Sequence, residues 1–406
     1  MRQFSSIFRR YPIQFWLLIF GLVVSTTGTT MVWPFLTIYA SETLSLPMAA
    51  VTSLMTFNSI SGLIASILAG TLVDYFGRKS IMVFGVFGMA LVYLSYIFAN
   101  EFWQFGLLMF LSGSFSPLYR IGTDAIVADM LPAEERAQAY GFLRMGRNIG
   151  VALGPILGGI VLSSSYNIGF VSAALALATY GIITLLFLKE TLERKTGEKR
   201  ESLGDQFRVM HQAMRNKAFM RMLGSFTLME ICATLMWVIL AVYIKQNFGI
   251  QEDQYSWIPT TNALMVIFLQ VGITRLTSRH DPHRVMPIGA AFYPLAMLIV
   301  AYSTNFWGFL LAMVVMTFGE LITAPTATAY VANLAPADQR GRYLGFFGLN
   351  WFIALSIGPM GAGILTDKFS IQTPWFVGAV VGVLSVLAFW SLRQIGKAPE
   401  ATQEIS

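Results

Sequence analysis

Residues 128–136 read Ala-Asp-Met-Leu-Pro-Ala-Glu-Glu-Arg, and residues 332–340 read Ala-Asn-Leu-Ala-Pro-Ala-Asp-Gln-Arg. The two segments share both alanines, the proline and the arginine, and they lie 204 positions apart in a chain of 406 residues. A constant offset of this kind predicts that one half of the chain repeats the other. The same offset pairs Trp103 with Trp307, Gly141 with Gly345, Gly154-Pro155 with Gly358-Pro359, and Gly159 with Gly363.

The composition places this repeated unit in a lipid bilayer. Hydrophobic residues make up 55% of the chain, charged residues make up 12%, and the mean hydropathy is +0.63. Soluble domains carry about 25% charged residues, so this chain has too little charge to cover a surface that faces water. The apolar stretches run close to the ~20 residues that a spanning helix needs, without the alternation of membrane strands. We therefore predict an all-α integral membrane protein.

Twelve transmembrane helices are expected, in two bundles of six related by a pseudo-two-fold axis. A polar, charged segment at residues 189–217 is predicted to be a cytoplasmic linker between an N-terminal bundle (1–188) and a C-terminal bundle (218–406). Parallel six-helix repeats are a transporter architecture with a site where the repeats meet, and the alternative is an inert duplicated anchor. The expected spans are 13–38, 48–72, 80–99, 103–130, 138–163, 168–188, 219–246, 256–276, 285–303, 307–333, 342–365 and 375–395.

The distribution of basic residues predicts the orientation. If the N-terminus is cytoplasmic, 24 of the 27 Lys and Arg residues lie in inside segments, Lys245 and Lys368 lie outside, and Arg120 lies within a span. This asymmetry predicts a multi-pass protein of the plasma membrane or bacterial inner membrane with both termini in the cytoplasm. The run from Ile13 to Ile38 is longer than the apolar region of a signal peptide and is expected to form the first span.

The segment between the second and third spans, residues 70–79, reads Gly-Thr-Leu-Val-Asp-Tyr-Phe-Gly-Arg-Lys. Glycines at both ends permit a tight turn, and Asp74 can favour a nearby helix N-terminus. The segment resembles the loop 2–3 signature of the major facilitator superfamily, G-x-L-x-D-x-x-G-R-K, at every fixed position. A solvated basic turn that only sets topology is the alternative interpretation.

This resemblance implies a conformational latch at the cytoplasmic ends of the helices. Asp74 would meet a helix end from the second half, and Arg78 would pair with Asp129 at the end of the fourth helix. The latch would comprise Gly70, Asp74, Gly77, Arg78, Lys79 and Asp129.

The fifth helix carries a glycine pattern in which Gly150, Gly154 and Gly158 share one face and Pro155 loosens the backbone. Such a face lets another helix approach closely, and ordinary membrane packing explains it as well. With Gly159, the pattern is similar to the antiporter motif of the twelve-helix drug:proton exporters of the superfamily. That branch usually carries an arginine in the fourth helix where this chain has Phe110.

Ionisable residues within the spans are functional candidates, because a charge in the bilayer is costly. Arg120 and Asp124 are four apart on one helix, which permits a side-by-side ion pair that is either structural or titratable. Glu230 and Glu320 have no cation within one turn of their own helices. A buried carboxyl without a cation favours its protonated form, so we predict that Glu320, and secondarily Glu230, carry protons. A neutral glutamic acid that only packs is the alternative.

Large apolar side chains could line a substrate cavity. Trp33, Trp237, Trp351 and Met236 are the candidates, because aromatic and methionine surfaces suit hydrophobic ligands. Interfacial aromatic belts account for many tryptophans equally well. Arg144 is added to these candidates, since the resemblance places it toward the central cavity.

The leading hypothesis is a proton-coupled exporter of drug-like or hydrophobic compounds that works by alternating access. The alternative is a proton-coupled transporter of one defined metabolite, such as a sugar, amino acid or organic anion, with Arg120 and Arg144 as anion anchors. A membrane enzyme is disfavoured, because one cysteine and three histidines supply neither a catalytic cluster nor a metal site. No P-loop is present. We expect no cofactor, no metal and no nucleic acid partner, and a monomer that handles a small molecule and protons in the lipid bilayer.

Overall fold

The computed structural model describes residues 10–192, 210–336 and 339–392, and every regular element in these ranges is a helix. Eleven of the helical segments are long and apolar enough to cross a membrane. The prediction of an all-α integral membrane fold built from two helical bundles is confirmed. Most of the predicted linker, residues 193–209, lies outside the described ranges.

The first half forms six antiparallel segments joined by short connections. Pro34 lacks an N–H group, and a short 3-10 helix breaks the first segment at this point. The elements are α2 (Ile13–Val32) with η1 (Trp33–Phe35) and α3 (Leu36–Leu44), α4 (Met48–Phe76), α5 (Arg78–Ser95) with η2 (Tyr96–Phe98), α6 (Phe102–Met130), α7 (Ala133–Leu162) and α8 (Tyr166–Phe187).

The helix α6 is the member of this bundle that is not among the eleven apolar segments, although it has 29 residues and packs against α4 and α5. It carries Arg120, Asp124 and several serines, which lower its hydropathy. These residues face a cavity described below, so α6 completes the bundle as its sixth segment and owes its polarity to the site.

The second half has the same order of segments. The π-helical turn η3 lies in its first segment and contains Trp237, which the offset of 204 pairs with Trp33 in η1. Both halves therefore break their first segment at the same repeat position. The elements are α10 (Lys217–Thr234) with η3 (Leu235–Ile239) and α11 (Leu240–Phe248), α12 (Glu252–Tyr255) with α13 (Trp257–Thr277), α14 (Pro282–Ala290) with α15 (Phe292–Tyr302), α16 (Phe306–Leu334), α17 (Arg340–Gly348) with α18 (Asn350–Lys368), and α19 (Thr373–Ser391).

The repeat is visible in the packing inside each bundle. The backbone of Gly154 on α7 lies so close to Thr30 of α2 that an added Cβ would overlap the threonine hydroxyl. At the same repeat positions, a Cβ on Gly358 of α18 would overlap the hydroxyl of Thr234 on α10. The duplicated sequence therefore gives the same helix contact twice.

The contacts between the bundles repeat in the same way. A Cβ on Gly159 of α7 would lie 2.7 Å from the Ser256 side chain at the start of α13, and a Cβ on Gly363 of α18 would overlap Thr52 of α4. The offset of 204 relates Gly159 to Gly363 and Thr52 to Ser256. Close packing of α7 on α13 and of α4 on α18 thus joins the halves with the pseudo-two-fold symmetry that the sequence predicts.

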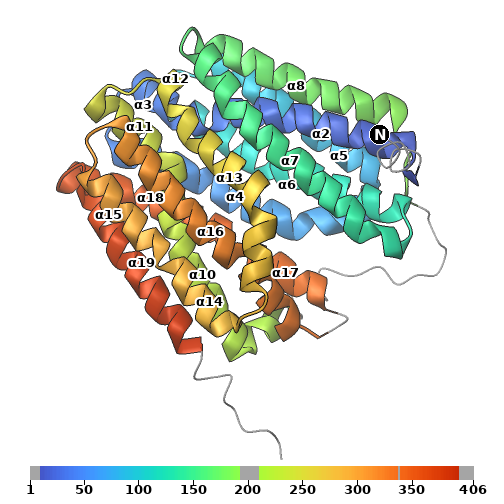
Figure 1. Ribbon diagram of the computed structural model, residues 1–406. Coiled ribbons are helices and arrows are strands. Elements are labelled where there is room, and N and C mark those ends of the chain that lie inside the picture. The colour runs from blue at the N-terminus through green and yellow to red at the C-terminus, as the bar shows by residue number, and fades with distance from the viewer. Residues whose placement is uncertain (1–9, 193–209, 337–338, 393–406) are drawn as a thin grey trace, which may run out of the picture.

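The two ends of the molecule are named here by their connections. The linker face holds the loops at 76–78 and 130–133, the ends of α16 and α17 at 334 and 340, and both borders of the linker. The hairpin face holds the connections at 44–48, 162–166 and 248–252 among others. In Figure 1 the first half, blue to green, lies at the upper right and the second half, yellow to red, at the lower left. The hairpin face is toward the upper left, near α3, α11 and α12.

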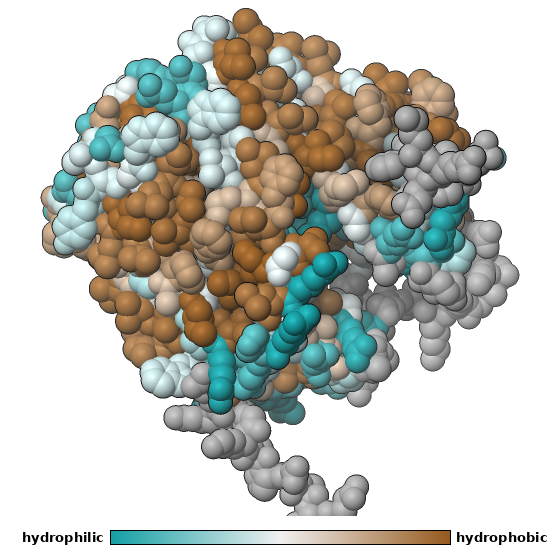
Figure 2. Space-filling model, in the orientation of Figure 1, coloured by the Kyte–Doolittle hydropathy of each residue, from teal (hydrophilic) through white to brown (hydrophobic). Residues whose placement is uncertain are grey.

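The surface is zoned as a bilayer requires. Figure 2 shows hydrophobic residues over the middle of the visible face and hydrophilic residues gathered toward the ends. The described Lys and Arg residues lie mainly near the linker face, for example Arg78, Lys79, Arg215 and Arg340. An excess of Lys and Arg at one face is the pattern from which the sequence predicts that the linker face is cytoplasmic.

Candidate functional site

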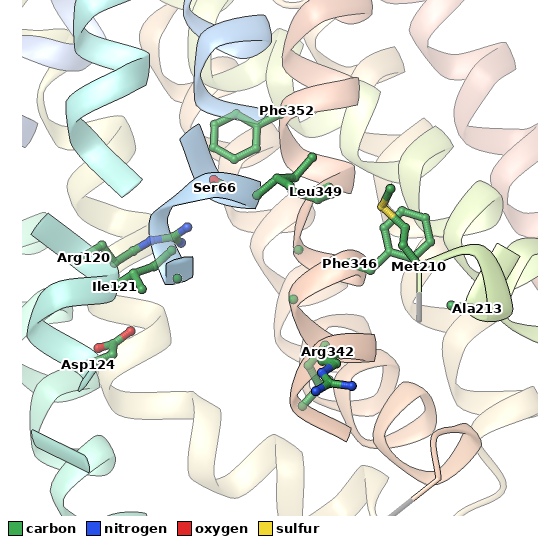
Figure 3. Close-up of a pocket in the computed structure, with 15 residues that line it drawn as sticks. Ser66, Arg120, Ile121, Asp124, Met210, Ala213, Arg342, Phe346, Leu349 and Phe352 are labelled. Atoms are coloured by element: carbon green, nitrogen blue, oxygen red, sulfur yellow. The ribbon is translucent and has the colours of Figure 1, made fainter. Parts of the chain in front are cut away.

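A cavity of about 430 Å³ lies between the two bundles near the linker face (Figure 3). Figure 3 shows Arg120 and Asp124 of α6 on one side of an open space and Phe346, Leu349 and Arg342 on the other. We call it the linker-face cavity. Its first-half wall is Ser66, Ile67, Gly70, Arg120, Ile121 and Asp124. The opposite wall consists of Met210 and Ala213 at the end of the linker and of Arg342, Leu344, Gly345, Phe346, Gly348, Leu349 and Phe352 of the second half.

A second cavity of about 250 Å³, the inner cavity, has Arg120 and Phe352 in common with the first. These two side chains therefore stand where one cavity meets the other. The wall combines aromatic and hydroxyl side chains and consists of Thr29, Thr30, Trp33, Asn58, Met89, Tyr93, Ser112, Gly113, Ser116, Pro117, Tyr119, Arg120, Trp351, Phe352 and Leu355.

The predicted ion pair between Arg120 and Asp124 is not formed. Asp124 Oδ1 instead accepts a hydrogen bond from Arg147 Nη2 of α7 at 2.7 Å. Spacing of four residues permits a pair on one helix, but Arg147 reaches Asp124 from the neighbouring helix. Arg120 is exposed to the cavities, and no described residue makes a hydrogen bond or ion pair with its guanidinium.

The predicted cavity-lining residues divide into two groups. Trp33 and Trp351 lie in the wall of the inner cavity, one from each half. Met236 has no exposed surface and lies in the hydrophobic core, so its assignment to a cavity is wrong. Trp237, in the π-helical turn, packs against the same core and lines neither cavity. Arg144 is exposed on α7 but also lies outside both walls.

The structure brings Glu230 and Glu320 together inside the second bundle, from α10 and α16. The two carboxyl groups are close enough to interact electrostatically. Glu320 Oε2 accepts a hydrogen bond from Asn262 Nδ2 of α13 at 2.8 Å, and the same amide donates to Thr317 at 3.0 Å. The sequence did not predict this pair, since 90 positions separate its members and Asn262 carries no charge to mark it.

The carboxyl pair has no ion-pair partner among the described residues. Arg144, on α7 of the other bundle, attracts Glu320 electrostatically across the interface between the halves. The Tyr293 hydroxyl of α15 lies near both acids and bonds to Thr323. Both glutamates are of intermediate exposure, and together with Asn262 they form a polar cluster among the helices of the second bundle.

The loop 2–3 residues form a compact set of contacts at the linker face. Arg78 pairs with Asp129 of α6 at 2.9 Å, as the resemblance implies, and with Asp74 at 3.1 Å. Asp74 pairs with Arg78 of its own bundle, and no ion pair links it to a described residue of the second half. Gly70 lies in the wall of that cavity. Lys79 Nζ donates to the carbonyl of Leu185 at 2.8 Å.

Glu190 belongs to this set of contacts, and no motif in the sequence marked it. Its carboxylate accepts hydrogen bonds from the backbone N–H groups of Arg78 and Lys79, at 3.0 and 3.2 Å. It thereby caps the N-terminus of α5, where the helix dipole favours negative charge. The border of the linker is thus tied to loop 2–3.

Gly77→Ala is expected to lower stability. Gly77 has φ = +102° and ψ = 147°, a conformation that only glycine adopts easily. A Cβ there would also lie 2.5 Å from Glu190 Oε2. The strain should cost about 1–3 kcal/mol and lower the Tm of the purified protein in detergent. Gly272→Ala, where a Cβ meets nothing within 4 Å, is the matched control. Equal Tm values for the two variants would show that position 77 does not require glycine.

The glycine pattern of α7 packs against the first span. An added Cβ would lie 2.6 Å from Thr26 at Gly150 and would overlap the Met31 carbonyl at Gly158. Thr30 Oγ1 donates to the Gly150 carbonyl at 3.0 Å. Pro155 lies inside α7, where its missing N–H removes one backbone hydrogen bond from the helix. The pattern therefore fixes α7 on α2, and Gly159 alone faces the second half.

A charged network joins the halves at the hairpin face. Lys245 Nζ contacts Glu42 of α3 and Glu252 of α12, each at 2.5 Å. Glu252, whose side chain is 4% exposed, also accepts a hydrogen bond from the Tyr166 hydroxyl of α8 at 2.7 Å. We call these four residues the hairpin-face network. Lys245 had one signal in the sequence, namely that it is one of two basic residues expected on this face.

A second link at the hairpin face comes from Asp367 near the end of α18. Its carboxylate accepts hydrogen bonds from the backbone N–H groups of Met48 and Ala49, at 3.0 and 2.8 Å. Gln246 Nε2 also donates to Ser41 Oγ at 2.8 Å. Contacts between the halves thus gather at the hairpin face, while a cavity separates them at the linker face.

Comparison with known proteins agrees with this geometry. The description "Major Facilitator Superfamily" belongs to the family profile that matches residues 18–238 and 222–405. The uncharacterized MFS-type transporter YqjV of Bacillus subtilis (strain 168) is 26% identical over 381 residues, which are 93% of this chain and 92% of that protein. A Na(+), Li(+), K(+)/H(+) antiporter of Planococcus maritimus is 26% identical, over 84% of this chain and 86% of that protein. The multidrug resistance protein MdtH of Escherichia coli is 24% identical, over 81% of each chain.

Solved structures show the same fold at low identity. A peptide transporter POT in complex with sulfate superposes with a TM-score of 0.79 at 15% identity, over 95% of this chain and 94% of that one. A point mutant of the nucleoside transporter NupG superposes with a TM-score of 0.75 at 16% identity, over 93% of this chain and 99% of that one. With two repeated bundles around a cavity, a matching loop 2–3 segment and a family profile over both halves, the chain belongs to the major facilitator superfamily of transporters.

Proposed function

We propose that this transporter exports drug-like, hydrophobic compounds in exchange for protons. The observation that carries the proposal is the carboxyl pair Glu230 and Glu320, which has no ion-pair partner among the described residues and borders the interface between the halves. The inner cavity supplies the aromatic walls that hydrophobic cargo needs, with Trp33 and Trp351 from opposite halves. Two of the similar proteins are described as a multidrug resistance protein and as a cation/H(+) antiporter.

Access from one side at a time is the physical basis of this transport. The hairpin face is joined by the Lys245 network and the Asp367 cap, whereas the linker face holds the larger cavity. Because basic residues gather at the linker face, we propose that it is cytoplasmic and that this conformation loads cargo from inside. In the opposite conformation the linker-face cavity closes, and Asp74 then gains its contact with the second half.

Proton coupling requires a group whose charge changes with access. A carboxylate loses its stabilisation when a second carboxylate lies nearby in a medium of low dielectric constant. Glu320 is hydrogen-bonded to Asn262 and attracted to Arg144 of the other bundle. Movement of the bundles changes the distance between Arg144 and Glu320, and we propose that this change drives uptake and release of the proton.

The direct test is flux in reconstituted vesicles with an imposed pH gradient. A panel of lipophilic cations, neutral hydrophobic compounds, organic anions and single metabolites is screened for uphill movement against proton entry. Uphill flux of several unrelated hydrophobic compounds supports the proposal. Flux of no compound under any gradient contradicts it.

A second candidate is proton-coupled transport of one defined metabolite, and Arg120 favours it. Arg120 is a cation in the cavity wall, and no described residue forms an ion pair with it. It can therefore anchor one particular anion. In the same screen, uphill flux of a single metabolite and of nothing else would establish this alternative. Uphill flux of Na⁺ or K⁺ alone would instead assign the carboxyl pair to alkali cations.

A further inference from the structure

Arg120 occupies a position that a packing or structural role does not explain. It lies on α6 in the wall of both cavities, at their junction. Its side chain is exposed to the cavity, and Figure 3 shows it directed toward the space between the halves. The carboxylate one turn away, Asp124, is already bonded to Arg147. Arg120 thus keeps its full set of guanidinium donors for a ligand.

The charges in the cavity walls are unbalanced. Among the described residues, the charged side chains that line the two cavities are those of Arg120, Asp124 and Arg342. The pairing of Asp124 with Arg147 leaves no carboxylate among the described wall residues to balance Arg120. A cleft lined by one sign of charge attracts ligands of the opposite sign. A lipophilic cation would meet repulsion at this point.

The surroundings of Arg120 are those of an amphipathic site. Ser116 lies one turn earlier on the same face of α6 and adds a hydroxyl to the wall. Trp33 and Trp351 enter the inner cavity from opposite halves, and Phe352 stands beside the arginine at the junction. Guanidinium groups bind carboxylates and other oxyanions in a bidentate way, and the indole rings offer flat apolar surfaces for an aromatic body.

We infer that the inner cavity binds amphipathic organic anions, with the oxyanion on Arg120 and the hydrophobic body between Trp33 and Trp351. This inference rests on the proposed function, because it names the cargo class of the proposed exporter. It also agrees with proton exchange. An anion that leaves the cell while a proton enters moves charge in one electrical direction, so the membrane potential and the pH gradient act together.

The test uses three probes of nearly the same size and different charge: naphthoate, neutral naphthylmethanol and naphthylmethylammonium. Binding to the full-length protein in detergent is measured by calorimetry without any gradient. Naphthoate should bind about 10- to 100-fold more tightly than naphthylmethanol, the range expected for hydrogen bonds to a charged group. Arg120→Gln should remove this difference and leave naphthylmethanol binding unchanged. Arg120→Lys should keep part of it, and Arg275→Gln on the exposed end of α13 should keep all of it.

Two results would overturn the inference: equal affinity of the wild-type protein for naphthoate and naphthylmethanol, or equal loss of both ligands in Arg120→Gln. Unchanged naphthylmethanol binding in the variant demonstrates that its cavity is intact. Because this measurement uses no proton gradient, it separates the cargo class from the coupling. Anion preference without proton-driven flux would contradict the proposed export mechanism alone, whereas proton-driven flux of cations without anion preference would contradict this inference alone.

Discussion

Glu320→Gln should abolish uphill transport in vesicles with an imposed pH gradient, while exchange of labelled cargo down its own gradient remains measurable. Glutamine has the shape of the protonated glutamate and can still accept the hydrogen bond from Asn262, but it cannot release a proton. A gradient of one pH unit can sustain a ratio of about ten between the cargo concentrations on the two sides of the membrane for each proton exchanged, since a factor of ten corresponds to ~1.4 kcal/mol. The ratio in Glu320→Gln should fall to about one.

The matched control for this prediction is Glu135→Gln. Glu135 pairs with Arg10 at the linker face, with Nε to Oε1 at 3.0 Å and the arginine side chain 51% exposed. Exposed pairs of this kind contribute about 0–1 kcal/mol, so the control should keep full accumulation. Glu230→Gln should resemble Glu320→Gln more than it resembles the control, because the two acids interact. Full pH-driven accumulation in Glu320→Gln would remove this residue from the coupling mechanism.

The architecture could be predicted because it depends on properties that are local in the sequence. Apolar runs, short loops and the 204-residue offset are each read without knowledge of distant contacts. The offset even specifies contacts, since Gly154 with Thr30 and Gly358 with Thr234 occupy equivalent positions. The span expected at 103–130 corresponds to α6, although this helix is not among the eleven apolar segments because it borders a polar cavity.

The candidate site could be predicted only in part, because its partners come from different helices. Spacing of four residues suggested that Arg120 pairs with Asp124. In the structure, Asp124 of α6 instead forms its ion pair with Arg147 of the neighbouring helix α7. Glu230 and Glu320 were both candidates, but their proximity depends on how α10 packs beside α16. Met236 was misassigned because hydropathy alone does not distinguish a cavity wall from a core.

Lys245→Met should shift the protein toward a conformation that is open at the hairpin face. Lys245 is the cation between Glu42 of the first half and Glu252 of the second. Without it, Glu252 keeps only the Tyr166 hydroxyl as a side-chain partner while its own side chain stays 4% exposed. Breaking a buried ion pair by removing one partner costs about 3–5 kcal/mol. Separation of the halves at this face would hydrate Glu252 and relieve that cost, so opening becomes favourable.

The opening can be measured with a cysteine at position 256, in a background where the buried Cys232 is replaced by alanine. Ser256 is 3% exposed and packs against Gly159 of the other bundle, so a membrane-impermeant maleimide reaches it only when α7 and α13 separate. Lys245→Met should raise the labelling rate roughly tenfold or more, since 1.4 kcal/mol changes a population ratio tenfold. Lys368→Met removes the exposed lysine at the end of α18 and should leave the rate unchanged.

The double variant Lys245→Met with Glu252→Gln decides whether the buried charge is the cause. Glutamine at 252 can still accept the hydrogen bond from Tyr166 and carries no charge that needs hydration. Replacement of both partners by neutral groups of similar volume is often close to neutral for stability. The double variant should therefore label at nearly the rate of the parent protein. If it labels as fast as Lys245→Met alone, packing of the lysine chain rather than its charge holds the face closed, and the hairpin-face network is not an electrostatic gate.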